Sequence, residues 1–211
     1  MRILAFLLVL AAAATAAATP AVPDAFLPVP PPIQLLPVPK EVTWGKGVFE
    51  ITPSTRIVVG DGVTEEDLFA ARELNEELRA RFGATLRVVT AGELSTPRGH
   101  IVVGEPSINT LTARLLQSAG LTVSRTSPGP EGYVLRVLPD GMVVAGSDRR
   151  GTFYGVQTLH QLLRPGKALA SVPAVTIRDR PDHAIRAVHV ARCGATASHP
   201  GDPADRHARS Q

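Results

Sequence analysis

The chain has 211 residues, of which 44% are hydrophobic and 4% aromatic, with a formal net charge of +3. This composition supplies one core of ordinary size and leaves no room for an additional (β/α)8 barrel of ~250 residues. The charge does not indicate a nucleic-acid partner, because the Lys and Arg residues are scattered among acids and form no basic run.

Residues 1–18 are predicted to be a signal peptide. A positive start at Arg2 precedes an apolar stretch and an alanine run with A-x-A sites. The apolar stretch is shorter than the ~20 residues that a membrane-spanning helix needs, so a cleaved signal peptide is favoured over a retained membrane anchor. We therefore expect a secreted or otherwise extracytoplasmic (periplasmic or extracellular) chain that begins near Ala17 or Thr19. Cys193 is the single cysteine, so no internal disulfide is expected.

Residues 19–33 are predicted to be a Pro-rich linker. Eight prolines lie between Thr19 and Pro39, which favours an extended tether over a core segment. The alternative is a ligand for a proline-reading module.

An α/β domain is expected over residues 34–180. Alternation from Leu35 to Ile51 around a Gly-rich turn predicts a first pair of short strands. Thr64 is expected to cap a helix that buries a Leu-rich stripe and ends at Gly83. The pair Asp140-Gly141 predicts a hairpin. The other expected elements are strands over 55–59, 86–89, 100–103 and 172–177, and a weaker helix over 108–119.

The helix from about 149 to 163 is the element with the clearest signals. Ser147 or Asp148 is the expected N-cap, and an apolar stripe includes Gly155 and Leu159. A glycine inside a helix costs ~1 kcal/mol, so Gly155 is expected to let the helix approach the sheet closely. The element order predicts an α/β (α+β) two-layer sandwich, with a mainly antiparallel sheet and long helices packed on one face.

The same helix carries a resemblance to a known family. Gly146-Ser147-Asp148, followed by the run from Gly151 to Leu163, resembles the last helix of the non-catalytic N-terminal domain of glycoside hydrolase family 20, the β-N-acetylhexosaminidases. In that family the small domain precedes a catalytic (β/α)8 barrel. The resemblance implies that this barrel is absent here apart from a possible first strand, and that its absence would expose apolar surface on the helices. It also implies a catalytic barrel of the same chain and N-acetylhexosamine-containing glycans as partners.

No catalytic residue is assigned. The family resemblance implies an adjacent Asp-Glu pair, and no Asp-Glu dipeptide occurs in this chain. The acidic run Glu65-Glu66-Asp67 is explained as a helix start. The six histidines follow no zinc spacing, so neither a metal site nor a cofactor is expected.

Residues 181–193 are interpreted as a remnant of the first barrel strand. The run that contains Arg178 and Arg186 resembles the family's passage into that strand, which implies a substrate-binding role for Arg186. Ala187 replaces the family's glycine, and the alternative is that Arg186 is simply a charged residue on an orphan strand. Residues 194–211 contain no Val, Ile, Leu, Met or aromatic residue, which predicts a disordered or out-of-frame tail.

Three functions remain open. The chain could be the accessory N-terminal domain of a secreted β-N-acetylhexosaminidase, truncated and inactive alone. It could instead be a free-standing extracellular binding or structural module for amino-sugar polymers, for which the sequence shows no aromatic platform, since Trp44 is the only Trp. An intact hexosaminidase is the third, and the missing acid pair argues against it.

Overall fold

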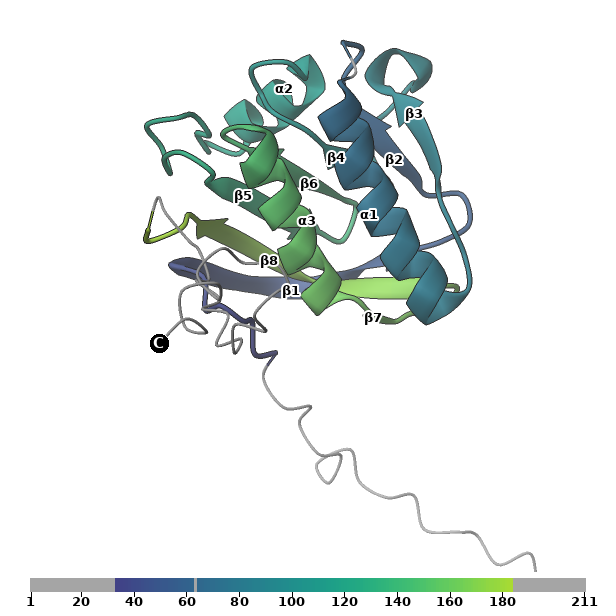
Figure 1. Ribbon diagram of the computed structural model, residues 1–211. Coiled ribbons are helices and arrows are strands. Elements are labelled where there is room, and N and C mark those ends of the chain that lie inside the picture. The colour runs from purple at the N-terminus through teal and green to yellow at the C-terminus, as the bar shows by residue number, and fades with distance from the viewer. Residues whose placement is uncertain (1–32, 63, 184–211) are drawn as a thin grey trace, which may run out of the picture. The chain divides into compact units, whose positions relative to one another are not determined.

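The computed structural model describes residues 33–62 and 64–183. Its strands and helices follow one another in the order shown in Figure 1. They are β1 Glu41–Ile51, β2 Arg56–Val59, α1 Glu65–Phe82, β3 Arg87–Thr90, the short 3-10 helix Ala91–Glu93, β4 Ile101–Val103, α2 Thr110–Ser118, β5 Tyr133–Leu138, β6 Gly141–Gly146, α3 Arg149–Leu162, β7 Arg164–Pro165 and β8 Ala170–Asp179.

All strands belong to one sheet, in the order β1-β8-β5-β6-β4-β2-β3, with β7 paired to β8. The pairings around β8 and β5 are antiparallel, whereas β6, β4, β2 and β3 run parallel to one another. The expected hairpin at Asp140 joins β5 to β6, where Leu138 pairs with Gly141. The sheet is thus antiparallel over one half and parallel over the other, a division that the sequence did not indicate.

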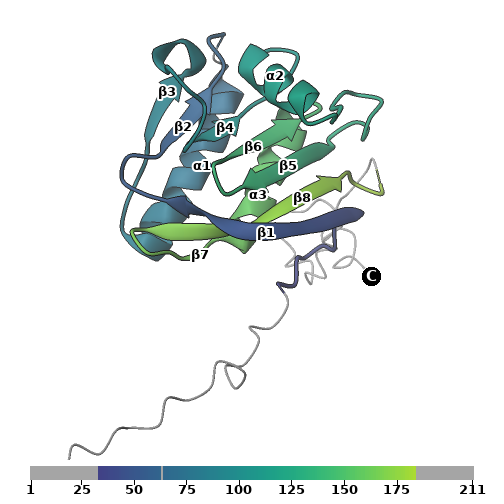
Figure 2. The same ribbon diagram turned by 180° about the vertical axis from the view of Figure 1, so that it is seen from behind.

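The two long helices lie side by side on one face of this sheet (Figure 1), which confirms the predicted sandwich. The shorter helix α2 packs on the opposite face, where Leu111 and Leu116 join a core with Val58, Val102 and Val143. Figure 2 shows this second face, on which no described helix covers β1, β8 and β5. The sandwich therefore gains a third layer only over its parallel half.

The predicted pair of short strands at the start of the domain is wrong. Residues 41–51 form one strand, β1, which pairs along its length with β8 and shifts register between Trp44 and Val48. Gly45-Lys46-Gly47 forms a bulge in this strand, and Gly47 has a positive φ of 89°. A glycine-rich bulge and a hairpin turn use the same residue types, so the local pattern could not distinguish them.

Capping residues fix the start of both long helices and the end of α1. The Thr64 hydroxyl accepts from the Asp67 N–H at 3.2 Å at the start of α1, and Gly83, with a φ of 71°, ends the helix. At the start of α3, Asp148 is the N-cap, and its carboxylate accepts from the Gly151 N–H at 2.9 Å. Of the two residues expected at this position, Asp148 therefore caps the helix and Ser147 does not.

Gly155 brings α3 against the sheet, as its position in the stripe predicted. A Cβ placed on Gly155 would lie 2.6 Å from Cγ1 of Val144 on β6 and 3.2 Å from Cδ2 of Tyr133 on β5. Both distances are shorter than ordinary van der Waals contacts. The close approach fixes the position of α3, and with it the side chains that α3 presents outward.

Candidate functional site

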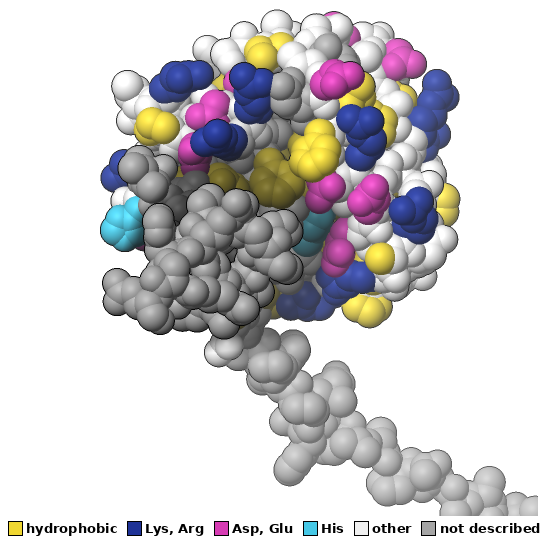
Figure 3. Space-filling model, viewed as in Figure 1, with side chains coloured by type: hydrophobic (Ala, Val, Ile, Leu, Met, Phe, Trp, Pro, Cys, Tyr) yellow, Lys and Arg dark blue, Asp and Glu magenta, His cyan; other side chains and the backbone are white. Residues whose placement is uncertain are grey.

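An aromatic cluster, formed by Phe69, Phe153 and Tyr154, lies on the outer side of α1 and α3. The rings of Phe69 and Phe153 stack with centroids 5.8 Å apart, and the ring of Tyr154 meets Phe153 edge-on at 5.8 Å. Phe69 is 48% exposed. Figure 3 shows hydrophobic side chains gathered in a hollow at the centre of this face. An exposed stacked aromatic group of this kind is typical of a contact surface.

A pocket of about 390 Å³ adjoins Tyr154 on the same helix. We call it the junction pocket, because it lies where the chain enters β1 and leaves β8. Its wall is the outer side of α3, and its other sides are residues 36–38 and 179–183. The residues that line it are Leu36, Pro37, Val38, Glu131, Tyr133, Tyr154, Gln157, Thr158, Gln161, Asp179, Arg180, Pro181, Asp182 and His183.

The segment before β1 is held on α3 by a two-point amide contact. The Gln161 side chain accepts from the Leu36 N–H at 2.8 Å and donates to the Leu36 carbonyl at 2.9 Å. Lys40 is held at the other end, where its N–H donates to the Asp179 carboxylate at 3.2 Å and its ammonium pairs with Asp182. The incoming and outgoing segments are therefore tied to each other and to α3.

The floor of the junction pocket is a buried hydroxyl pair. The hydroxyls of Tyr133 and Thr158 are 2.6 Å apart, and the Tyr133 hydroxyl donates to the Asp179 carboxylate at 3.5 Å. Burial is the main cause that raises the pKa of Tyr133 well above its usual range, and the nearby Asp179 raises it further. Tyr133 therefore stays protonated at physiological pH and acts as a hydrogen-bonding group rather than as a base.

The first turn of α3 is fixed to the loop before β5. One carboxylate oxygen of Asp148 caps the helix, and the other accepts from the Glu131 N–H at 2.9 Å. The Ser147 hydroxyl donates to the Gly129 carbonyl at 2.7 Å and accepts from the Gly132 N–H at 3.1 Å. These bonds hold the loop and the helix as one unit beside the junction pocket.

The far end of α3 is fixed by α1. The Arg81 guanidinium donates to the carbonyls of His160 and Leu163, each at 2.9 Å, and forms an ion pair with Glu77 at 3.3 Å. Burial lowers the pKa of His160, while the charge of Glu77 acts in the opposite direction. The Nε2 atom of His160 is buried and has no hydrogen-bond partner among the described residues. His160 is thus a neutral packing residue between the helices.

The residues singled out in the sequence are only partly within the described ranges. Arg186, with its predicted substrate-binding role, lies outside them, as do Cys193 and residues 184–211. His183 lines the junction pocket, and the His100 Nδ1 accepts from the Arg56 N–H at 3.2 Å.

In residues 33–62 and 64–183, no three His, Cys, Asp or Glu side chains form a group that could hold a metal. No described helix is long and apolar enough to cross a membrane.

The aromatic cluster was missed by the sequence analysis. Phe69 and Phe153 are far apart in the chain, and each stands beside the buried stripe of its own helix rather than in it. Only the packing of α1 beside α3 brings the two rings together. A search for non-stripe aromatic residues on both predicted helices would have marked these positions as candidates.

The fold and this surface define the class of the protein, a small α/β domain with two long helices on one face of a mixed sheet. Residues 32–180 match the family model described as Glycosyl hydrolase family 20, domain 2, and the chain belongs to this family.

Characterised relatives agree with this membership. The chain is 31% identical over 162 residues to a beta-hexosaminidase of Porphyromonas gingivalis, a match that covers 73% of this chain. It is similar to the solved GH20 β-N-acetylhexosaminidase of Streptomyces coelicolor A3(2), with 27% identity, a TM-score of 0.53 and 71% of this chain covered. The N-acetyl-β-hexosaminidase of Streptomyces plicatus matches with 29% identity, a TM-score of 0.50 and 70% of this chain covered.

The match spans only a small part of each relative. This chain covers 18% of the Porphyromonas protein, and 27% and 26% of the two Streptomyces chains. Most of each relative thus lies beyond the part that corresponds to the present chain.

Proposed function

We propose that this chain is the accessory N-terminal domain of a secreted β-N-acetylhexosaminidase, and that it is a truncated product without catalytic activity of its own. Under this proposal the whole enzyme would hydrolyse terminal N-acetylhexosamine residues, and its catalytic barrel would normally follow β8. The observation that carries the proposal is the aromatic cluster on α1 and α3, next to the residues that lead out of β8.

The geometry gives a reason for this placement. The segment 179–183 lines the junction pocket together with Tyr154, so a domain that follows in the chain starts beside the outer side of α3. Tyr154 also contacts Phe153 in the aromatic cluster. A barrel in this position would cover aromatic carbon that otherwise faces water, and burying such surface is favourable by roughly 25 cal/mol per Å².

The test uses the full chain and a variant with Phe69→Ser and Phe153→Ser. Wild type is expected to self-associate in sedimentation and to bind a hydrophobic dye, and the double variant to lose both properties. Trp44→Ser is the matched control, because Trp44 is equally exposed at 48% but lies on β1. A monomeric wild type that binds no dye would overturn the proposed docking face. No turnover of a chromogenic N-acetylglucosaminide is expected from any of these chains.

Truncation and secretion have their own tests. Translation of the nucleotide sequence downstream of the Arg186 codon in the other two frames should give an Asp-Glu pair within barrel-like repeats. If neither frame contains such repeats, the truncation proposal fails.

Amino-terminal sequencing of exported material should return a chain that starts near Ala17 or Thr19, and a start at Met1 would refute the signal peptide.

A free-standing module that binds amino-sugar polymers is the second candidate. The same aromatic cluster supports it, because sugar rings stack on exposed aromatic faces. Under this alternative the chain is retained on chitin and Phe69→Ala abolishes retention. Under the accessory-domain proposal neither protein is retained.

A further inference from the structure

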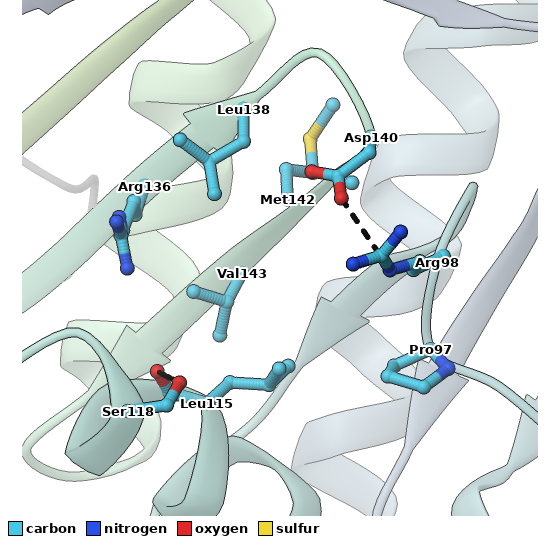
Figure 4. Close-up of a pocket in the computed structure, with 10 residues that line it drawn as sticks. Pro97, Arg98, Leu115, Ser118, Arg136, Leu138, Asp140, Met142 and Val143 are labelled. Atoms are coloured by element: carbon cyan, nitrogen blue, oxygen red, sulfur yellow. Dashed lines mark hydrogen bonds and ion pairs between the residues drawn. The ribbon is translucent and has the colours of Figure 1, made fainter.

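A second concave site lies on the opposite face of the sheet from the aromatic cluster. We call it the sheet groove. It has a volume of about 270 Å³ and runs between the end of α2, the β5–β6 hairpin and the loop around Arg98 (Figure 4). The proposed function does not involve this site.

The floor of the sheet groove is aliphatic. Val143 of β6 lies at its centre, and Leu115 of α2 and Leu138 of β5 stand on either side. Leu138 is 40% exposed at the rim. The Ser118 hydroxyl, also in the lining, already donates to the Leu115 carbonyl at 2.9 Å. A ligand seated here would therefore meet apolar carbon over most of its body.

One side chain in the lining has an unmet bonding capacity. Arg136 is half-buried in the middle of β5, between Val143 on β6 and Thr176 on β8. Within residues 33–62 and 64–183, its guanidinium forms no ion pair and no hydrogen bond. A guanidinium presents five donors, and those of Arg136 are left for water or for a ligand in the groove.

The neighbouring arginines differ from Arg136 in this respect. Arg178, on the same sheet face, donates to the Thr122 carbonyl at 3.3 Å and to the Ser127 hydroxyl. Arg98 forms an ion pair with Asp140 at 3.6 Å on the rim of the groove. Because that pair is neutral as a whole, Arg136 leaves the lining with a net positive charge.

We propose that the sheet groove binds a small organic carboxylate with an apolar body, whose carboxylate pairs with Arg136 and whose body lies on Val143 and Leu115. The planar fork of arginine matches both oxygens of a carboxylate. The volume lies just below the range of about 300–1,000 Å³ typical of drug-sized ligands, which restricts the occupant to a small molecule or a chain terminus.

Titration of the isotope-labelled full chain tests this proposal. Hexanoate is expected to shift the amide resonances of Met142 and Val143, whereas hexanol and hexylamine, which share its apolar body, should bind about 10-fold more weakly or not at all. N-acetyl-Gly-Leu distinguishes a peptide carboxyl terminus from a free organic acid, because it adds an amide backbone that the groove must also accept.

Arg136→Met should weaken hexanoate binding about 10-fold, since it removes the fork and keeps an apolar stem. Arg72→Met on α1 is the matched control, with the same change in charge on the other face of the sheet, and should change binding less than about 2-fold. If Arg136→Met does not fold, Arg136→Lys, which keeps the charge and loses the fork, should still weaken binding. Equal affinity for hexanoate and hexanol, unchanged binding in the folded Arg136 variant, or shifts confined to other regions would overturn the proposal.

Discussion

Replacement of Gly155 by alanine tests whether α3 is fixed against the sheet. In a free helix this substitution would stabilise by about 1 kcal/mol. Here the new methyl group would lie 2.6 Å from Cγ1 of Val144. Val144 is fully buried and β-branched, so its side chain cannot turn away easily.

The overpacking cost of an inserted methyl group in a tight core is about 1–3 kcal/mol. When the gain in helix propensity is subtracted from this cost, Gly155→Ala is expected to destabilise the protein by about 1 kcal/mol. The assay is urea denaturation of the full chain, with the midpoint compared at constant slope. A variant that is more stable than wild type by about 1 kcal/mol would refute the reasoning, because it would show that α3 moves away at no cost.

The double variant with Val144→Ala identifies the contact. Val144→Ala alone should destabilise by about 2 kcal/mol through lost methyl groups and a cavity. Combined with Gly155→Ala, the new methyl group enters the space that Val144 vacates, so the two effects should couple by about 1 kcal/mol in the favourable direction. Strict additivity would mean that the strain in the single variant arises elsewhere, for example at Tyr133.

Three further predictions concern the ends of α3. Asp148→Ala should destabilise by about 2 kcal/mol, because two backbone N–H groups lose a charged acceptor, and Asp148→Asn should recover part of this loss in the same urea assay. Arg81→Met should lower the free energy of unfolding by about 2 kcal/mol, because two carbonyls at the end of α3 lose their donor. Glu77→Gln removes only a half-exposed ion pair and should lower the free energy of unfolding by less than about 0.5 kcal/mol. The lowered pKa of His160 means that the unfolded chain binds the proton more readily, so stability should fall as the pH drops below about 6.5 toward the lowered value. His160→Gln should flatten this dependence relative to wild type in denaturation midpoints measured across that range, and an unchanged slope would contradict it.

Local signals were sufficient for the helices. Thr64, Gly83 and Asp148 are capping residues of standard type, and each stands at the helix end where the sequence placed it or offered it as a choice. Gly155 could be assigned a close-packing role because a glycine in a buried stripe has few other uses. These features depend on residues within one or two turns of each other, which is the range over which sequence patterns are informative.

Long-range pairing was not predictable in the same way. The strand β1 was divided in two because Gly45 and Gly47 resemble turn residues, and its true partner β8 lies more than a hundred residues further along. No turn motif in the sequence indicates the parallel half of the sheet, because its strands are joined through helices and loops. The unpaired state of Arg136 depends on which side chains the fold brings near it, and composition alone carries no such information.

The pairing of β1 with β8 has a mechanical consequence. Glu41, at the start of β1, pairs with Arg178, near the end of β8, so the chain enters and leaves this strand pair at the same end. A pulling force applied between the two flanking segments would therefore break the hydrogen bonds between β1 and β8 one residue pair after another, instead of shearing all of them at once. The two-point contact of Leu36 with Gln161 and the bond from Lys40 to Asp179 are the first contacts to carry that force. Resistance to pulling in this domain is set by a few contacts at one corner and not by the size of its core.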